Sequence, residues 1–283
     1  MSDLTTIDQN ALQEMNALLG TEVSGGGGSS AIVRVPELKI NSRSRDKDSK
    51  KPIPEGSFFL TNMDQKVYAE KVSFRPLASH IQYFHWEEID GVRKLVNKSM
   101  SIARPSEEAR DMLGGIACGM PSWEVLKEMD YADAKKWKTM RNRVTRGLVS
   151  YTGKTMDDEE VTLENQPCIM FHKNSTYGGF WNEFMSKLPK GKQIYEYTAE
   201  MGTEYNENGS VVWYTPTYSV DLSKSLGITQ DVFDTMKVFA ETIKNENKQI
   251  TDAYFKAIKE GALDEAAYDA LGDSLDADFE EVA

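Results

Sequence analysis

The sequence predicts a mainly β (α+β) protein with helical insertions, a long C-terminal helix and disordered termini. Segments rich in β-branched and aromatic residues, as strands are, recur from Ala31 to about Leu222. From Thr229 to about Lys259 an apolar stripe recurs at helical spacing. The last 24 residues hold nine acidic side chains and no basic one, too much charge for independent folding. The expected parts are 1–30 (helix and linker), 31–222 (binding core), 223–259 (helix packed on the core) and 260–283 (acidic disordered tail).

The N-terminal part combines a short amphipathic helix with a flexible linker. Ile7, Leu12, Met15 and Leu18 lie at near-helical spacing, and a Gly/Ser run follows at 24–30. An isolated helix of this length is marginal in water. It is therefore either a partner-docking element or a frayed terminus.

The next part reads as a succession of strands with two helical interruptions. The expected strands are Ile32–Ile40, Ser57–Thr61, Lys66–Arg75, Ser79–Glu87, Lys98–Ile102, Arg141–Tyr151, Gln166–Lys173, Gln193–Met201 and Ser210–Val220. The interruptions are expected at Ser122–Lys138 and Gly178–Leu188. Strands and long helices do not alternate regularly, which disfavours a parallel nucleotide-binding sheet. Thr229 is the expected N-cap of the long helix, which we expect to pack on the sheet.

The net charge of −12 hides a basic region. Residues 31–150 contain 22 basic and 16 acidic side chains, a net charge of +6. A mobile acidic end can compete with a polyanion for such a surface, because both are held by screened Coulomb attraction. This pattern favours a nucleic-acid partner, although an acidic tail can also serve solubility alone. No apolar run is long enough for a membrane span and no signal peptide is visible, so we expect no membrane association, a cytoplasmic location, and reduced thiols at Cys118 and Cys168.

The densest basic segment, Lys135–Lys154, holds seven basic side chains and no acidic one. In an extended strand Arg141, Arg143 and Tyr151 share one face, and Arg146 lies on the other. Sheets that bind single-stranded nucleic acid combine cations for the phosphates with aromatic rings for base stacking. An ordinary solvated strand face is the alternative.

A polar loop with Arg43, Arg45, Lys47, Lys50 and Lys51 forms a second basic cluster, which can clamp a phosphate backbone. Of the aromatic residues in the neighbouring strands, Tyr83 and Trp86 are candidates for stacking, although the core is the commoner place for such rings. The candidate DNA-binding residues are Arg43, Arg45, Tyr83, Trp86, Lys138, Arg141, Arg143, Arg146, Tyr151, Lys154 and Lys173.

Signals for catalysis, cofactors and metals are weak. Gly147–Thr155 resembles a phosphate-binding loop, but five residues instead of four separate its glycines and an acidic run follows. Cys168 and His172 lie about two pleats apart on one strand, too far for easy joint zinc ligation. A nuclease that uses the carboxylates of Asp157–Glu160 ranks third, after the two non-catalytic functions described below. We therefore expect no enzyme, no cofactor and no metal site.

The order of elements resembles the single-stranded DNA-binding proteins of bacteriophages. The resemblance covers residues 31–220 loosely and residues 141–188 more closely. The closer part consists of the basic strand 141–149, a polar loop, the strand 166–171, and the helix-opening residues 177–184, Tyr-Gly-Gly-Phe-Trp-Asn-Glu-Phe. Those proteins are OB-fold proteins with acidic C-terminal tails. This chain departs from them in its last residues, Phe279 to Ala283, which do not end on an aromatic residue, and in lacking the compact zinc cluster that some members carry.

The resemblance implies an OB-like barrel and sequence-independent, cooperative coating of single-stranded DNA in phage replication, recombination or repair, in the host cytoplasm. It also implies a tail that shields the groove and recruits replication proteins. The expected partner-binding residues are Asp273, Asp276, Asp278, Phe279, Glu280 and Glu281. Self-association stays open. The alternative function is a non-catalytic phage protein that binds another protein, such as a virion-associated protein.

Overall fold

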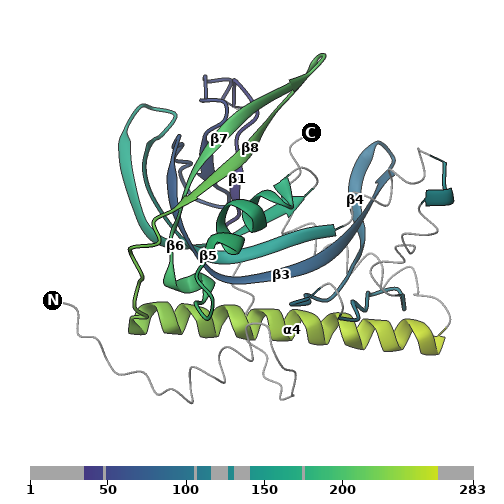
Figure 1. Ribbon diagram of the computed structural model, residues 1–283. Coiled ribbons are helices and arrows are strands. Elements are labelled where there is room, and N and C mark those ends of the chain that lie inside the picture. The colour runs from purple at the N-terminus through teal and green to yellow at the C-terminus, as the bar shows by residue number, and fades with distance from the viewer. Residues whose placement is uncertain are drawn as a thin grey trace. The chain divides into compact units, whose positions relative to one another are not determined.

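The computed structural model divides into two compact units, each discontinuous along the chain (Figure 1). The first contains Val35–Ser79 and Val144–Lys237, and the second contains His80–Arg143 and the chain from Val238. Strands β3 (Val72–Ile89) and β5 (Arg141–Lys154) and helix α4 (Gln230–Glu260) contribute residues to both units. The structure describes residues 35–46, 49–104, 107–115, 127–130, 141–173 and 176–260.

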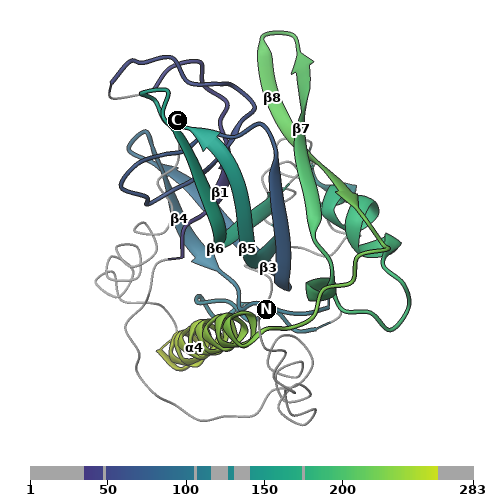
Figure 2. The ribbon, with the colours of Figure 1, turned by 90° about the vertical axis from the view of Figure 1, so that its left-hand side faces the viewer.

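Strands make up 44% of the residues that the structure describes, so the prediction of a mainly β chain with one long C-terminal helix is confirmed. Six antiparallel strands form one sheet in the order β6-β5-β3-β7-β8, with β4 paired to the end of β3 (Figure 2). A separate pair joins β1 and β2. The other bounds are β1 (Leu38–Ile40), β2 (Phe58–Leu60), β4 (Val92–Lys98), β6 (Glu160–Lys173), β7 (Ala199–Asn208) and β8 (Val211–Val220).

The expected closed barrel is not formed. In the ladders of the described residues β6 and β8 end the sheet, and no ladder joins them. Strand β1 lies against both, and a parallel bridge joins Glu37 to Ile169 of β6. Among the described residues β1 forms its ladder with β2 and only a single bridge to β6, so the sheet stays open.

The strand predictions succeeded best where the hydrophobic pattern is long. Strands β5 and β8 lie close to their predicted places, and Gly178–Leu188 forms the short helices η3 (Phe180–Phe184) and η4 (Met185–Lys187). The two strands predicted within 66–87 are a single strand, because Pro76 and Leu77 continue the extended backbone of β3. The polar strand β4 was missed. A further short helix, η5 (Ile194–Glu196), occupies the first part of the segment expected to form a strand before Met201, so β7 begins later.

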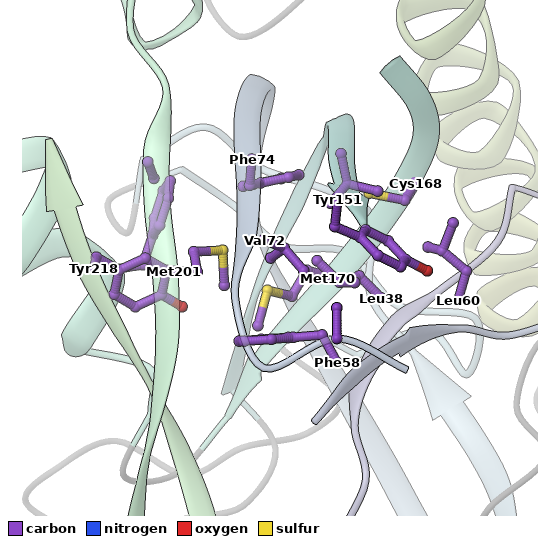
Figure 3. Packing of buried hydrophobic residues seen from close by; sticks show 14 of the residues in the cluster. Leu38, Phe58, Leu60, Val72, Phe74, Tyr151, Cys168, Met170, Met201 and Tyr218 are labelled. Carbon is purple, nitrogen blue, oxygen red and sulfur yellow. The ribbon is translucent and has the colours of Figure 1, made fainter. Parts of the chain in front are cut away.

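The core of the first unit forms where the sheet packs against β1, β2 and η3. Phe58, Phe74 and Phe180 are fully buried in it. Figure 3 shows the Tyr151 ring within this cluster, beside Leu60 and Cys168. Burial raises the pKa of the Cys168 thiol well above its ordinary value, which fits the expected reduced, unreactive thiol. Cys118 lies outside the described residues.

Strand β5 passes unusually close to its neighbours at two glycines. A Cβ on Gly147 would lie 2.8 Å from the Phe74 ring and closer still to the carbonyl oxygen of Arg75. A Cβ on Gly153 would collide with the carbonyl of Tyr68. These glycines therefore serve strand packing and not a phosphate loop.

Helix α4 begins after Thr229, whose side chain accepts a 3.4 Å hydrogen bond from the Val232 N–H, as an N-cap does. Its C-terminal part belongs to the second unit, where Glu246 pairs with Lys98 and Asn247 bonds the backbone of Ser101. Phe255 and Ile258, expected in the buried stripe, are 54% and 55% exposed. In the described part of the chain no helix combines the length and apolar character needed to cross a membrane.

Candidate nucleic-acid interface

The basic loop, residues 43–52, is anchored to the core by one buried side chain. The amide of Asn41 donates to the carbonyl oxygens of Arg43 and Pro54, at 2.8 and 2.7 Å, and accepts from the Arg43 N–H at 3.1 Å. An isolated antiparallel β-bridge pairs Arg45 with Pro52, and the Asp46 N–H donates to the carbonyl oxygen of Lys51 at 2.9 Å. The loop is therefore hairpin-like at its base and carries its cations outward.

An acidic turn, residues 157–160 between β5 and β6, lies against the basic loop. Lys51 pairs with Asp157, and Lys154 lies 2.7 Å from Asp158. The hydrogen bond that the Lys154 ammonium donates to Asp158 raises the pKa of Lys154, which favours its charged form. All four side chains are at least 48% exposed. Such ion pairs add little stability because water and salt screen them, so a phosphate can replace the carboxylates.

Aromatic rings support this surface from below. Phe59 and Tyr68 lie 5.5 Å apart, and the Lys66 ammonium lies 5.6 Å from the Phe59 ring centre. Backbone bonds between Tyr68 and Lys154 tie the rings to the end of β5. Burial, with a contribution from Asp46, raises the pKa of Tyr68. The rings are only 9% and 5% exposed, so they position cations and do not offer faces to bases.

Three predicted DNA-binding residues belong to the surface that the basic loop and the acidic turn form: Arg43 and Arg45 lie in the loop, and Lys154 pairs with the turn. We call it the cationic lobe; it also includes Lys50, Lys51 and Lys66. Lys173 lies elsewhere in the unit, at the exposed end of β6, where its charge acts on Glu37. Burial raises the pKa of Glu37, and Lys39 and Lys173 only partly offset this effect.

The predicted basic and aromatic face of β5 is not formed. Tyr151 is buried in the core, where burial raises its pKa to about 12, and Arg143 and Arg146 are 9% and 5% exposed. The predicted alternation of exposed and buried side chains failed because both faces of β5 are covered along most of its length. Strand β5 pairs with β6 and β3 within the sheet. Only its ends, at Arg141 and Lys154, reach solvent.

The second unit holds the remaining described candidates. Tyr83 is buried against Ile81 and Ile102, so its ring does not face solvent. Trp86 is half-buried, and the guanidinium of Arg93 lies 5.5 Å from its ring centre. Arg141 is exposed. Lys138 and the tail residues Asp273, Asp276, Asp278, Phe279, Glu280 and Glu281 lie outside the described residues.

Sequence reasoning missed the contributions of Lys66 and Arg93, because each depends on a ring that folding places beneath it. Of the four carboxylates in Asp157–Glu160 that a nuclease would use, those of Asp157 and Asp158 pair with lysines of the lobe. Among the described residues no three His, Cys, Asp or Glu side chains gather as a metal site does.

Trp86 is the tryptophan expected to report on nucleic-acid binding from the second unit. A base that stacks beside Arg93 would quench the indole, so the fluorescence decrease on adding oligo(dT) should be smaller in Trp86→Phe than in the unchanged protein. Trp181→Phe, which removes an exposed indole of the first unit, is the matched control. Equal quenching in Trp86→Phe and the unchanged protein would remove Trp86 from the interface.

Comparisons with protein-family models, curated proteins and solved structures gave no match.

Proposed function

We propose that this chain is a non-catalytic, sequence-independent single-stranded DNA-binding protein whose cationic lobe contacts the phosphate backbone. The observation that carries the proposal is that Lys51, in the loop that contains Arg43 and Arg45, pairs with Asp157, three residues beyond Lys154, which brings these basic segments together. About 110 residues separate Arg43 and Arg45 from Lys154 in the sequence.

The chemistry of the lobe favours phosphates over bases. Four of its cations, Arg45, Lys50, Lys51 and Lys154, are exposed and Arg43 and Lys66 are half-buried, whereas the rings beneath them are buried. Phosphate contacts carry no sequence information, which fits the coating of any single strand. Exposed carboxylates of the acidic turn occupy Lys51 and Lys154 in the free protein, so binding exchanges one weak anionic partner for another. Because neutralised phosphates release their counterions, we expect binding to weaken as salt is added.

The finer fold expectation also belongs to this proposal. An OB-like arrangement needs a curved antiparallel sheet whose edges approach each other. The contacts of β1 with both β6 and β8 support it, although the two edge strands do not pair.

A titration of labelled oligo(dT) over a range of salt concentrations tests the function. Affinity should fall linearly on a plot of log affinity against log salt, with a slope of about −0.7 for each phosphate contact. A mixed-sequence strand should bind equally well, and duplex DNA more weakly. If no strand binds at low salt, the alternative, a protein that recognises only another protein, is preferred.

Deleting residues 260–283 is expected to tighten binding to single strands, chiefly at low salt. The deletion removes nine negative charges that compete with DNA for the basic surface, and added salt screens this competition. The measurement is the ratio of the two affinities across the salt series. Equal affinities at low salt would exclude shielding and leave the tail to solubility or partner docking.

A further inference from the structure

The β7–β8 hairpin extends beyond the sheet to which it belongs (Figure 1). In the ladders of the described residues β3 pairs with β7 only from Ala199 to Met201. From Gly202 onward β7 and β8 pair with each other alone, up to Asn208 and Val211. Gly209, with φ of 62°, begins the two-residue turn, as a glycine does in a type II′ hairpin. We call residues 202–217 the arm.

The arm exposes apolar side chains on both faces. Val211 is 61% exposed, Tyr205 52% and Val212 43%. Tyr205 and Tyr214 face each other across the strands with ring centres 5.7 Å apart. A two-stranded hairpin with open edges is marginally stable in water and is a template for pairing with another chain.

The charge of the arm limits what can bind it. Glu204 and Glu207 lie on β7, and Glu200 just precedes the arm. Between Ala199 and Val220 the sequence contains no Lys or Arg. Phosphates are repelled by such a surface, and a second arm would bring like charges together. The arm therefore differs in charge from the cationic lobe and calls for a cationic partner.

A hollow at the base of the arm also favours a cationic group. It is lined by Glu55, Glu70, Lys71, Thr203 and Thr217, among others, at the place where β7 leaves β3. The Tyr214 hydroxyl donates to Glu55 at 3.1 Å, which connects the hollow to the ring pair. A long cationic side chain is the group that fits two carboxylates and hydroxyls there.

We propose that the arm binds an extended, arginine-bearing segment of another protein. The segment adds as a strand to the free edge of β7, its arginines meet Glu204 and Glu207, and its apolar residues cover the exposed valines and tyrosines. This binding is independent of the proposed DNA binding, because it uses other residues and the opposite charge.

The test uses the full-length protein and a labelled synthetic peptide of Val and Thr, as long as the arm, with two Arg residues three positions apart so that one Arg lies on each face, as Glu204 and Glu207 do. It should bind in fluorescence anisotropy. A peptide with Gln in place of Arg should bind about tenfold more weakly, because its contacts with the carboxylates are lost. A peptide with Pro at alternate positions should also bind more weakly, since Pro cannot donate to a ladder.

Protein variants locate the site. The double substitution Glu204→Gln and Glu207→Gln should weaken the arginine peptide about tenfold, whereas Glu164→Gln and Glu241→Gln, which removes the same charge at two exposed positions elsewhere, should not. Equal affinity of the arm variant and the unchanged protein would overturn the proposal. Sedimentation would also overturn it if the unchanged protein is a dimer and the arm variant is a monomer, because the occupant of the arm would then be a second copy of the chain. Oligo(dT) affinity, measured in parallel, tests the lobe separately.

Discussion

Replacing Arg43, Arg45 and Lys154 together with Ala is expected to weaken binding to single-stranded DNA about a hundredfold at ~0.1 M salt, since each lost phosphate contact lowers the magnitude of the salt slope by about 0.7. The slope itself should fall by about 2. The fold should survive, because the loop is anchored by Asn41 and by backbone bonds that these side chains do not make. Oligo(dT) titrations at several salt concentrations measure both quantities.

The matched control replaces Lys187, Lys190 and Lys224 with Ala. These lysines are exposed in the first unit, and their loss changes the net charge equally. If the control weakens binding as much as the lobe variant, the effect reflects net charge and not a site. A lower affinity with an unchanged slope would show that the lobe residues do not contact phosphates.

The second large effect concerns stability. Gly147→Ala is expected to lower the free energy of unfolding by about 3 kcal/mol, because overpacking a closely packed interior forces the surrounding structure to move. The added methyl group meets the Arg75 carbonyl and the Phe74 ring, 2.8 Å away, and neither can yield easily within a central strand pair. Urea unfolding followed by circular dichroism gives the value.

Gly178→Ala provides the comparison. A Cβ there would meet only the Asn182 side chain at 3.5 Å, which is an ordinary contact. We expect this variant to unfold within about 1 kcal/mol of the unchanged protein. Should the two variants prove equally stable, the close approach of β5 to β3 is not a constraint on the fold.

The sequence predicted strands and the long helix well because apolar periodicity records local burial. The sequence could not predict that β5 is covered on both faces, since the pattern of apolar residues alone does not say what packs on each face of a strand. Arg143, Arg146 and Tyr151 were therefore assigned to a surface that is closed. The loop residues Arg43 and Arg45 were placed better, because a polar, proline-bounded segment reaches solvent in almost any fold.

The sequence could not predict which cations pair with aromatic rings or with nearby acidic side chains. Lys66 lies over Phe59 and Arg93 over Trp86 only because separate segments meet. Strand β4 was missed because its first residues, Val92 to Lys94, are exposed and mostly charged. In each case the decisive information is a tertiary contact.

The interleaving of the two units has a consequence for how the chain is made. The Ser73 hydroxyl bonds Glu200 across a sequence separation of 127 residues, and the first unit is closed only by residues up to Lys237. The second unit then needs the end of α4. Neither can be completed early during synthesis on the ribosome, and both have high contact order, for which folding is slow. Until α4 emerges, β3 lacks final partners such as Glu246, whose carboxylate accepts a hydrogen bond from Gln82, and a chain in that state is exposed to aggregation.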